Sequence, residues 1–291
     1  MNHKEPVVVR LHFAVVHYFN PDGGGRHGSL SPDSLGRTSA LRELILQLHR
    51  LFGHPTGALN HVKRRVEIVK DIESELKISI CITKDKHLLN ELEDLENVGA
   101  FTRIECEPDQ PKHLGFQCHR ILEQDYTKYD YNCYLEDDII IRDADFFKKL
   151  HRFNQVFSDI YLLQPNRIET SQNLKNLRRF LIDGDYNPEA TEKYRRSMNK
   201  ELYMDHLGES VLFTQPFNTH SGCFFLNKKQ SNKYFKSEYW DVEDTSFHGP
   251  LESAATLGVM KMFQIMKPHL TNSQFLTVEH AGRNFIGMLD A

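Results

Sequence analysis

The sequence of 291 residues has no apolar run that approaches the ~18 to 20 residues needed for a helix across a bilayer. Residues 1–10 lack the charged-then-apolar order of a secretory signal peptide. The net charge is −4, so no excess of basic residues is available to bind a nucleic-acid backbone. These absences predict a cytoplasmic protein, or one at the inner face of a membrane, and exclude nucleic acid as a partner.

Cysteine is also scarce. The five cysteines are odd in number and form no C-x-x-C pair, which argues against a zinc or redox site. We expect reduced, mostly buried thiols, because cysteine often packs as a small apolar side chain. The remaining composition, 40% hydrophobic and 26% charged, is typical of a soluble globular protein that buries roughly three quarters of its unfolded surface. Disorder, collagen-like repeats and a small disulfide scaffold are therefore excluded.

Strand-like and helix-like patterns alternate along the chain, which favours an α/β fold with a mixed, mainly parallel sheet flanked by helices. Strands are expected over 7–19, 77–83, 101–106, 131–135, 159–164, 221–226 and 275–278, and helices over 41–52, 87–96, 114–123, 143–157, 228–240 and 251–263. Dense charge indicates an insertion or lid over 173–215. We expect one domain over 1–291, with a nucleotide-binding half (1–140) and an acceptor-binding half (141–291).

The most informative motif is Glu136-Asp137-Asp138, directly after the apolar strand predicted over 131–135. Three adjacent carboxylates repel one another unless a cation lies between them, and hard oxygen ligands select Mg²⁺, Mn²⁺ or Ca²⁺. In open α/β sheets, ligands bind beyond the carboxyl ends of the strands. The alternative is a solvated acidic turn.

At this motif the sequence resembles the GT-A-fold glycosyltransferases, in which a D-x-D or E-D-D motif holds a divalent cation on a nucleotide-sugar diphosphate. The resemblance implies that Asp138 ligates Mn²⁺ or Mg²⁺ directly. It also implies that Glu136 and Asp137 hold the ribose or metal-bound water. The segment 111–116 followed by Arg120 is similar to the family's loop and helix before this motif, where a basic residue approaches the nucleotide; a solvated arginine on an ordinary amphipathic helix is the alternative.

Three features further along the chain are similar to the same family. His220-Ser221-Gly222 would line the donor and acceptor sugars, although glycine also marks bends. Glu252, after Gly249-Pro250, would be the catalytic base if the enzyme inverts, and Glu243-Asp244 is a rival pair. A carboxylate at a helix start also complements the helix dipole. His280 would be a second metal ligand, with a purely structural histidine as the alternative.

A glycine cluster after the first strand, Gly23-x-Gly25-x-x-Gly28, spells the dinucleotide-binding fingerprint. That fingerprint requires the glycines to lead directly into a helix, whereas residues 29–33 intervene before the helical pattern begins. We therefore favour a flexible loop over a nucleotide. The side chains expected within reach of the nucleotide are His17, Asn20 and Arg26 or Arg37.

Taken together, these features predict a metal-dependent glycosyltransferase of the hexosyltransferase type. It would transfer a sugar from a nucleoside-diphosphate sugar, with a UDP-sugar favoured, to an acceptor hydroxyl of a saccharide or glycan. Glycan or polysaccharide biosynthesis is the expected context. Two alternatives stay open: an NAD-dependent oxidoreductase that uses the glycine cluster, and a non-catalytic carbohydrate-binding protein.

Overall fold

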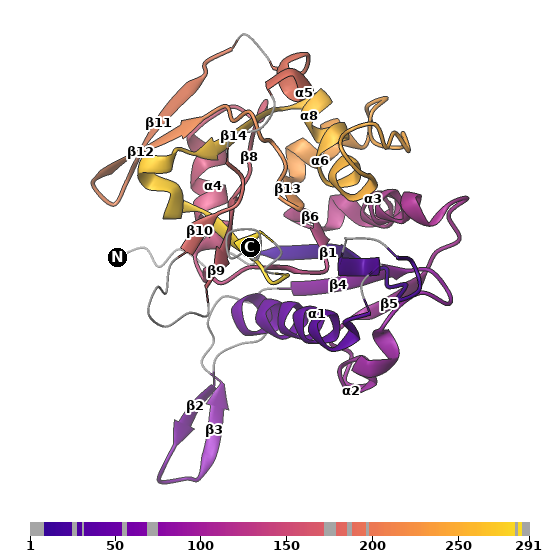
Figure 1. The fold of residues 1–291 in the computed structure, drawn as a ribbon. Helices are drawn as coiled ribbons and strands as arrows, with labels where there is room; N and C mark the ends of the chain where they lie inside the picture. Colours follow the sequence, from indigo (N-terminus) through magenta and orange to yellow (C-terminus); the bar gives the residue numbers. More distant parts are fainter. Residues whose placement is uncertain are drawn as a thin grey trace.

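A five-stranded sheet in the order β13-β6-β1-β4-β5 forms the centre of the protein. The structure is a computed structural model, and it describes residues 9–24, 28–30, 32–53, 57–68, 75–171, 179–184, 188–195, 198–282 and 285–286. The five strands are β1 (Arg10–Val16), β4 (Glu75–Ile82), β5 (Thr102–Glu105), β6 (Tyr131–Glu136) and β13 (Cys223–Asn227). Only β13 runs antiparallel to its neighbour, so the predicted mixed, mainly parallel sheet is confirmed (Figure 1).

Helices cover both faces of this sheet. Phe13 belongs to the hydrophobic cluster that includes the buried side of α1 (Ser34–Leu48), whereas the next residue, Ala14, belongs to the cluster that includes α3 (Leu114–Asp125). Successive side chains of a strand point to opposite faces, so β1 is buried from both sides. That burial explains why, after Arg10, its sequence is apolar except for His12 and does not alternate between apolar and polar residues.

Two smaller sheets lie beside the central one, and both contain strands that the sequence did not predict. The first has the order β10-β9-β15-β7, and the second has the order β11-β12-β14-β8. Their strands are β7 (Ile139–Ile140), β8 (Tyr161–Leu163), β9 (Asn166–Thr170), β10 (Arg179–Leu181), β11 (Glu201–His206), β12 (Glu209–Thr214), β14 (Gln264–Pro268) and β15 (Thr277–His280). The predicted insertion over 173–215 joins these sheets, since β10 pairs with β9 and β12 with β14.

The remaining helical elements are mostly short, and several of them were not predicted. They are η1 (Gly28–Leu30), η2 (His49–Gly53), η3 (Leu89–Leu92), α2 (Glu93–Asn97), η4 (Pro111–His113), η5 (Tyr126–Lys128), α4 (Phe146–Val156), α5 (Pro188–Glu192), α6 (Lys228–Tyr234), α7 (Pro250–Glu252), η7 (Ser253–Leu257), α8 (Gly258–Met262) and η8 (Leu270–Phe275). The helix predicted over 228–240 is too long. It ends at Tyr234, whose carbonyl accepts a hydrogen bond of 2.7 Å from the Ser237 hydroxyl.

One two-stranded hairpin stands apart from the sheets. It consists of β2 (Gly57–Asn60) and β3 (Arg65–Ile68), which pair with each other and project from the body below α1 in Figure 1. The sequence analysis did not predict these strands.

The five cysteine thiols are free, and all except Cys106 are buried, as expected. Among the described residues, no helix is both long and apolar enough to cross a bilayer.

Candidate active site

The three carboxylates that follow β6 are buried. Glu136, Asp137 and Asp138 are 8%, 5% and 6% exposed, which rules out the alternative of a solvated acidic turn. To bury a charge without a hydrogen-bond or ion-pair partner costs roughly several kcal/mol. The partners of each carboxylate therefore determine whether it is charged and whether it can bind a cation.

Asp137 is held by two side chains from the first part of the chain. His17 Nδ1 lies 2.5 Å from one carboxylate oxygen, and the Arg37 guanidinium donates to the other. Burial alone would raise the pKa of Asp137, but the charge of Arg37 and the contact with His17 lower it to about 2. The Leu88 N–H donates to His17 Nε2 over 2.9 Å, so the proton of a neutral His17 lies on Nδ1 and points at Asp137. His17 is fully buried and therefore positions Asp137 instead of contacting a nucleotide.

Asp138 lies between an arginine and a histidine. Its Oδ2 accepts a hydrogen bond of 2.8 Å from Arg37 Nη1 and lies 3.6 Å from His280 Nε2. Its Oδ1 is buried and has no hydrogen-bond partner among the described residues. His280 Nδ1 is in turn 2.8 Å from Glu169, a fully buried carboxylate on β9. Burial alone would raise the pKa of Glu169, but the hydrogen bond from His280 lowers it.

Glu136 is in contact with the segment His220-Ser221-Gly222, which we call the glycine loop. Its backbone N–H donates to the Gly222 carbonyl over 2.9 Å, and His220 Nε2 lies 3.7 Å from its Oε1. Gly222 has a φ of +64°, and a Cβ there would lie 2.8 Å from Ile139 and 3.1 Å from the Glu136 carboxylate. Only glycine fits this close approach. Burial, reinforced by the charge of Asp138, raises the pKa of Glu136 well above its usual value.

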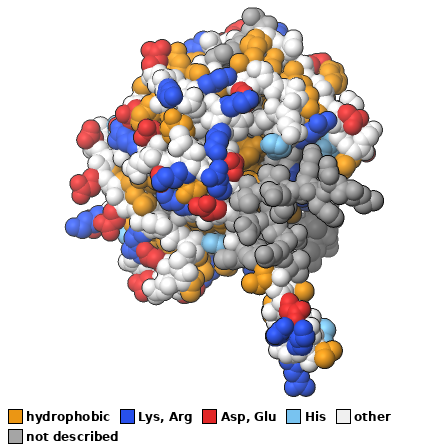
Figure 2. Space-filling view, turned by 180° about the vertical axis from the view of Figure 1, so that it is seen from behind, with side chains coloured by type: hydrophobic (Ala, Val, Ile, Leu, Met, Phe, Trp, Pro, Cys, Tyr) orange, Lys and Arg blue, Asp and Glu red, His pale blue; other side chains and the backbone are white. Residues whose placement is uncertain are grey.

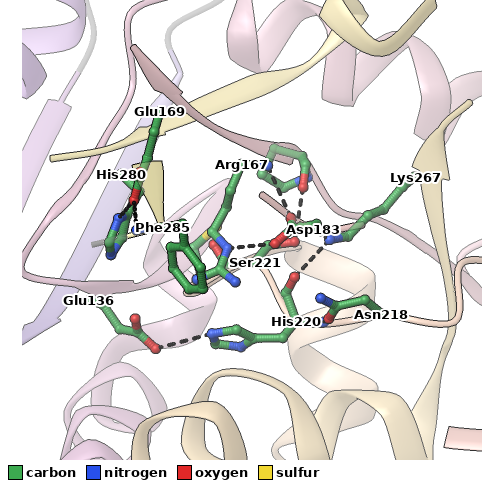
Figure 3. Close-up of polar contacts among 12 residues, drawn as sticks. Glu136, Arg167, Glu169, Asp183, Asn218, His220, Ser221, Lys267, His280 and Phe285 are labelled. Carbon is green, nitrogen blue, oxygen red and sulfur yellow. Dashed lines mark hydrogen bonds and ion pairs between the residues drawn. The ribbon is translucent and has the colours of Figure 1, made fainter. Parts of the chain in front are cut away.

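A buried ion cluster lies next to the glycine loop and contacts its backbone (Figure 3). Asp183 accepts hydrogen bonds of 2.8 Å from both Arg167 Nε and Lys267 Nζ, and Lys267 also donates to the His220 carbonyl over 2.7 Å. Burial alone would raise the pKa of Asp183, but the two cations lower it to about 2. Ser221 is anchored through its hydroxyl to the Pro165 carbonyl over 2.9 Å.

Neither this cluster nor Glu169 was predicted from the sequence. The available signal was weak: in Asn166–Thr170 the two charged residues Arg167 and Glu169 flank Ile168 in an alternating pattern. That pattern is typical of a half-exposed strand, whereas both of these charged side chains are buried.

A cavity of about 380 Å³ lies next to the acidic motif. Its polar lining residues are Ser29, Arg37, Lys112, Asp137 and Glu252, and its bulky apolar ones are Val16, Tyr18, Leu30, Leu114, Pro250 and Leu251. Glu252 folds back over Gly249, where a Cβ would lie 2.5 Å from the Glu252 carboxylate. The volume falls within the range of roughly 300 to 1,000 Å³ that is usual for small-molecule sites.

The rival base candidates lie elsewhere. Glu243 is 2.8 Å from His113 and 3.1 Å from Arg120, and Asp244 pairs with Lys261 at 3.1 Å. Asp244 lines only a small cavity of about 10 Å³. Arg120 also pairs with Asp241, so the structure engages Arg120 in a surface ion pair and does not place it in the larger cavity.

The glycine cluster does not lead directly into an α-helix, since only the short 3-10 helix η1 begins at Gly28. α1 begins at Ser34, and its N-cap is Asp33, which accepts from the Gly36 N–H over 2.9 Å. The dinucleotide fingerprint is therefore not in its required context, which disfavours the NAD-dependent alternative. Asn20 is partly buried, and its backbone N–H donates to the Ser29 carbonyl over 2.8 Å, so it shapes this loop. Arg26 and Gly25 lie outside the described residues.

The ligand atoms that the site offers suit a hard divalent cation that takes most of its ligands from a bound small molecule and water. Within the described ranges, no three His, Cys, Asp or Glu side chains converge as a ready-made metal site. Asp138 offers an unpartnered buried oxygen, and His280 offers Nε2, because its Nδ1 faces Glu169. One or two protein ligands, completed by phosphate oxygens and water, is the usual arrangement for Mg²⁺.

Comparisons with known proteins give likenesses to solved structures only. No protein-family model and no curated protein matches the sequence. The crystal structure of GalNAc-T7 with UDP, GalNAc and Mn²⁺ has a TM-score of 0.46 and 11% identity, over 95% of this chain and 44% of that one. The crystal structure of S. aureus TarS residues 1–349 has a TM-score of 0.46 and 11% identity, over 97% of this chain and 63% of that one.

This chain thus spans less than two thirds of the length of each of these two chains. Both likenesses extend over nearly the whole of this chain. With a TM-score of 0.46 and 11% identity, neither likeness carries an argument about this chain, and the function is inferred from the site itself.

Proposed function

We propose that the protein is a metal-dependent glycosyltransferase that transfers a sugar from a nucleoside-diphosphate sugar to an acceptor hydroxyl in glycan or polysaccharide synthesis. The observation that carries this proposal is the buried acidic end of β6. There Asp138 keeps its Oδ1 without a hydrogen-bond partner among the described residues, its Oδ2 lies 3.6 Å from His280, and Asp137 borders a cavity of about 380 Å³. Asp137 and Asp138 share one guanidinium, so Arg37 neutralises only one of their two charges, and a bound cation would balance the other.

The donor would bind with its diphosphate near the acidic motif. Asp138 and His280 would hold Mn²⁺ or Mg²⁺, and the bound cation would stabilise the negative charge that develops on the leaving diphosphate. Arg37 and Lys112 supply positive charge at the cavity wall, where phosphate oxygens would lie. The apolar lining would contact the flat base of the nucleotide, and we favour UDP as that nucleotide.

On the acceptor side, we propose that Glu252 is the general base of an inverting reaction. The acceptor oxygen would form a bond to the anomeric carbon while the bond from that carbon to the diphosphate oxygen breaks, and the diphosphate would leave with the electron pair. The acceptor proton would pass to the Glu252 carboxylate. Glu252 supports this role because it lines the same cavity as Asp137, whereas Glu243 and Asp244 do not.

Nucleotide binding with and without Mn²⁺ tests the proposal. Calorimetry with UDP should show tighter binding when Mn²⁺ is present, and Asp138→Asn should remove that enhancement. Asp145→Asn is the matched control, since Asp145 is an exposed carboxylate that pairs with Lys148 at 2.7 Å. If UDP, UDP-sugars and the other nucleotides bind equally with and without the metal, or not at all, the proposal is wrong.

A further inference from the structure

The β2–β3 hairpin has no core of its own. Its strands form a separate two-stranded sheet, and no other described strand pairs with either of them. It projects from the body in two views (Figures 1 and 2). An isolated two-stranded hairpin is marginally stable in water at best, so a hairpin of this kind normally gains stability from a surface that covers it.

The register divides the hairpin into two unlike faces. Leu59 pairs with Val66, and Gly57 pairs with Ile68, which places these residues on one face. The other face consists of Ala58, Asn60, Arg65 and Glu67. The first face is apolar throughout and yet open to solvent, with Leu59, Val66 and Ile68 exposed by 58%, 65% and 69%.

The polar face is ordered by its own hydrogen bonds. Glu67 Oε1 accepts from Asn60 over 3.3 Å, from Lys63 over 3.2 Å and from Arg65 over 3.1 Å. These contacts join side chains of the polar face and do not involve the apolar face. The apolar face is therefore preformed for contact with something outside the body of the protein.

The turn combines an apolar tip with basic residues. Val62 is 95% exposed, and Lys63 and Arg64 follow it directly. Residues 57–68 contain three basic residues and one acidic residue, in a chain whose net charge is −4. Figure 2 shows the hydrophobic and basic side chains side by side on the projecting hairpin. This charge is complementary to an anionic surface.

A second copy of the chain is a poor fit for this face. A stable protein interface buries roughly 800 Å² and 20 to 30 residues on each side. The hairpin offers four exposed bulky apolar residues: Leu59, Val62, Val66 and Ile68. A lipid surface needs no such area, because shallow insertion of a few apolar side chains acts together with attraction between basic residues and lipid phosphates.

We propose that the β2–β3 hairpin docks the protein on an anionic lipid surface. Val62 and the apolar face enter the interfacial region, and Lys63 and Arg64 contact the lipid phosphates. This inference goes beyond the proposed function and does not depend on it, because none of these residues belongs to the candidate active site.

Co-sedimentation of the full chain with vesicles tests the proposal. The protein should bind vesicles of phosphatidylcholine that contain about one third phosphatidylserine, and bind pure phosphatidylcholine much more weakly. Each basic residue near such a surface contributes roughly fivefold in affinity, so Lys63→Glu/Arg64→Glu should weaken binding by roughly 25-fold or more. Leu59→Ser/Val66→Ser should also weaken binding, through the lost apolar contact.

Matched controls change equally exposed residues elsewhere. Lys148→Glu/Lys229→Glu reverses two lysine side chains that are 70% and 80% exposed, and Val98→Ser/Leu270→Ser removes two exposed apolar side chains. Both control variants should bind like the original protein. All four variants should keep its melting temperature within a few degrees, which excludes unfolding as the cause of lost binding.

Two results would overturn the proposal. The first is equal binding to both kinds of vesicle, or binding to neither. The second is a concentration-dependent dimer, seen by analytical ultracentrifugation, that Leu59→Ser/Val66→Ser dissociates while vesicle binding is absent. In that second case the hairpin joins two copies of the chain.

Discussion

Arg37 Nη1 lies 2.8 Å from Asp138 Oδ2, so a cation of the chain itself occupies one side of the carboxylate that we propose to hold the metal. Burial alone would lower the pKa of Arg37, but Asp137 and Asp138 raise it, and the guanidinium stays charged. Arg37 and a divalent cation would thus share Asp138. When both are absent, Asp137 and Asp138 lose the cations that offset their mutual repulsion.

The Arg37→Gln variant tests this relationship. Removal of one partner of a buried ion pair costs about 3 to 5 kcal/mol, so the metal-free variant should melt at a lower temperature than the original protein. Added Mn²⁺ should raise the melting temperature of the variant more than that of the original protein, because the metal replaces the missing charge. Differential scanning fluorimetry with and without Mn²⁺ measures both effects.

The control is Arg42→Gln, on the same helix. Arg42 pairs with Asp94 at the surface at 2.6 Å, and such pairs contribute up to about 1 kcal/mol. This variant should respond to Mn²⁺ as the original protein does. An identical metal response in all three proteins would show that Arg37 does not stand in for a cation.

For Glu252, the expected result is a loss of turnover. Glu252→Gln should lower kcat by about 10² to 10⁴-fold, the usual effect of removing a general base, and should leave UDP affinity nearly unchanged. Glu243→Gln is the control, because Glu243 is engaged by His113 and Arg120 outside the cavity. Release of UDP from a UDP-sugar in the presence of acceptor measures turnover. Loss of turnover in the Glu243 variant alone would move the base to that residue.

The sequence predicted the parts of the fold and site that depend on short-range patterns. The buried strands β1 and β6 are mostly apolar, and Glu136–Asp138 is contiguous, so both were recognisable without a structure. The order of the chain also predicted that His280 and the loop at His220 would approach this motif, and the structure brings both to it.

The support around the motif depends on pairs that are distant in the sequence. Asp183 is 16 residues from Arg167 and 84 residues from Lys267, and no local pattern links them. Their strands β9 and β14 are short and partly polar, so they resembled loops. The hairpin β2–β3 was missed for a related reason: its turn is charged, and its strands contribute nothing to the core.

His280 should depend on Glu169 for its ability to bind metal. The 2.8 Å contact with Glu169 holds the proton on Nδ1 and leaves Nε2 free to face Asp138. Loss of such a carboxylate partner typically lowers metal affinity by about 10 to 100-fold. We therefore expect weaker Mn²⁺ binding in Glu169→Gln, measured by electron paramagnetic resonance in the presence of UDP.

Glu279→Gln is the neighbouring control for this experiment. Glu279 pairs with Arg142 at 2.7 Å near the surface, so its replacement should leave the Mn²⁺ affinity unchanged. Equal affinity in the Glu169 variant would mean that His280 is not a ligand or that its orientation is set by other contacts.

The Asp183 cluster should make stability depend on acid in a defined range. The pKa of Asp183 is about 2 in the folded protein, compared with an ordinary value of 3.8. The lowered pKa of Asp183 therefore contributes about 2 kcal/mol to the free energy of unfolding above pH 3.8. This contribution is lost as the pH falls toward 2. Asp183→Asn should be less stable by about 3 to 5 kcal/mol at neutral pH, because Arg167 and Lys267 lose their buried partner.

The difference in the free energy of unfolding between the two proteins should shrink as the pH falls through this range, because acid removes the charge of Asp183 only in the original protein. Urea unfolding at a series of pH values measures it. Asp145→Asn, at an exposed ion pair with Lys148, should follow the original protein within about 1 kcal/mol. A constant difference between the Asp183 variant and the original protein at every pH would show that Asp183 keeps its ordinary pKa in the fold.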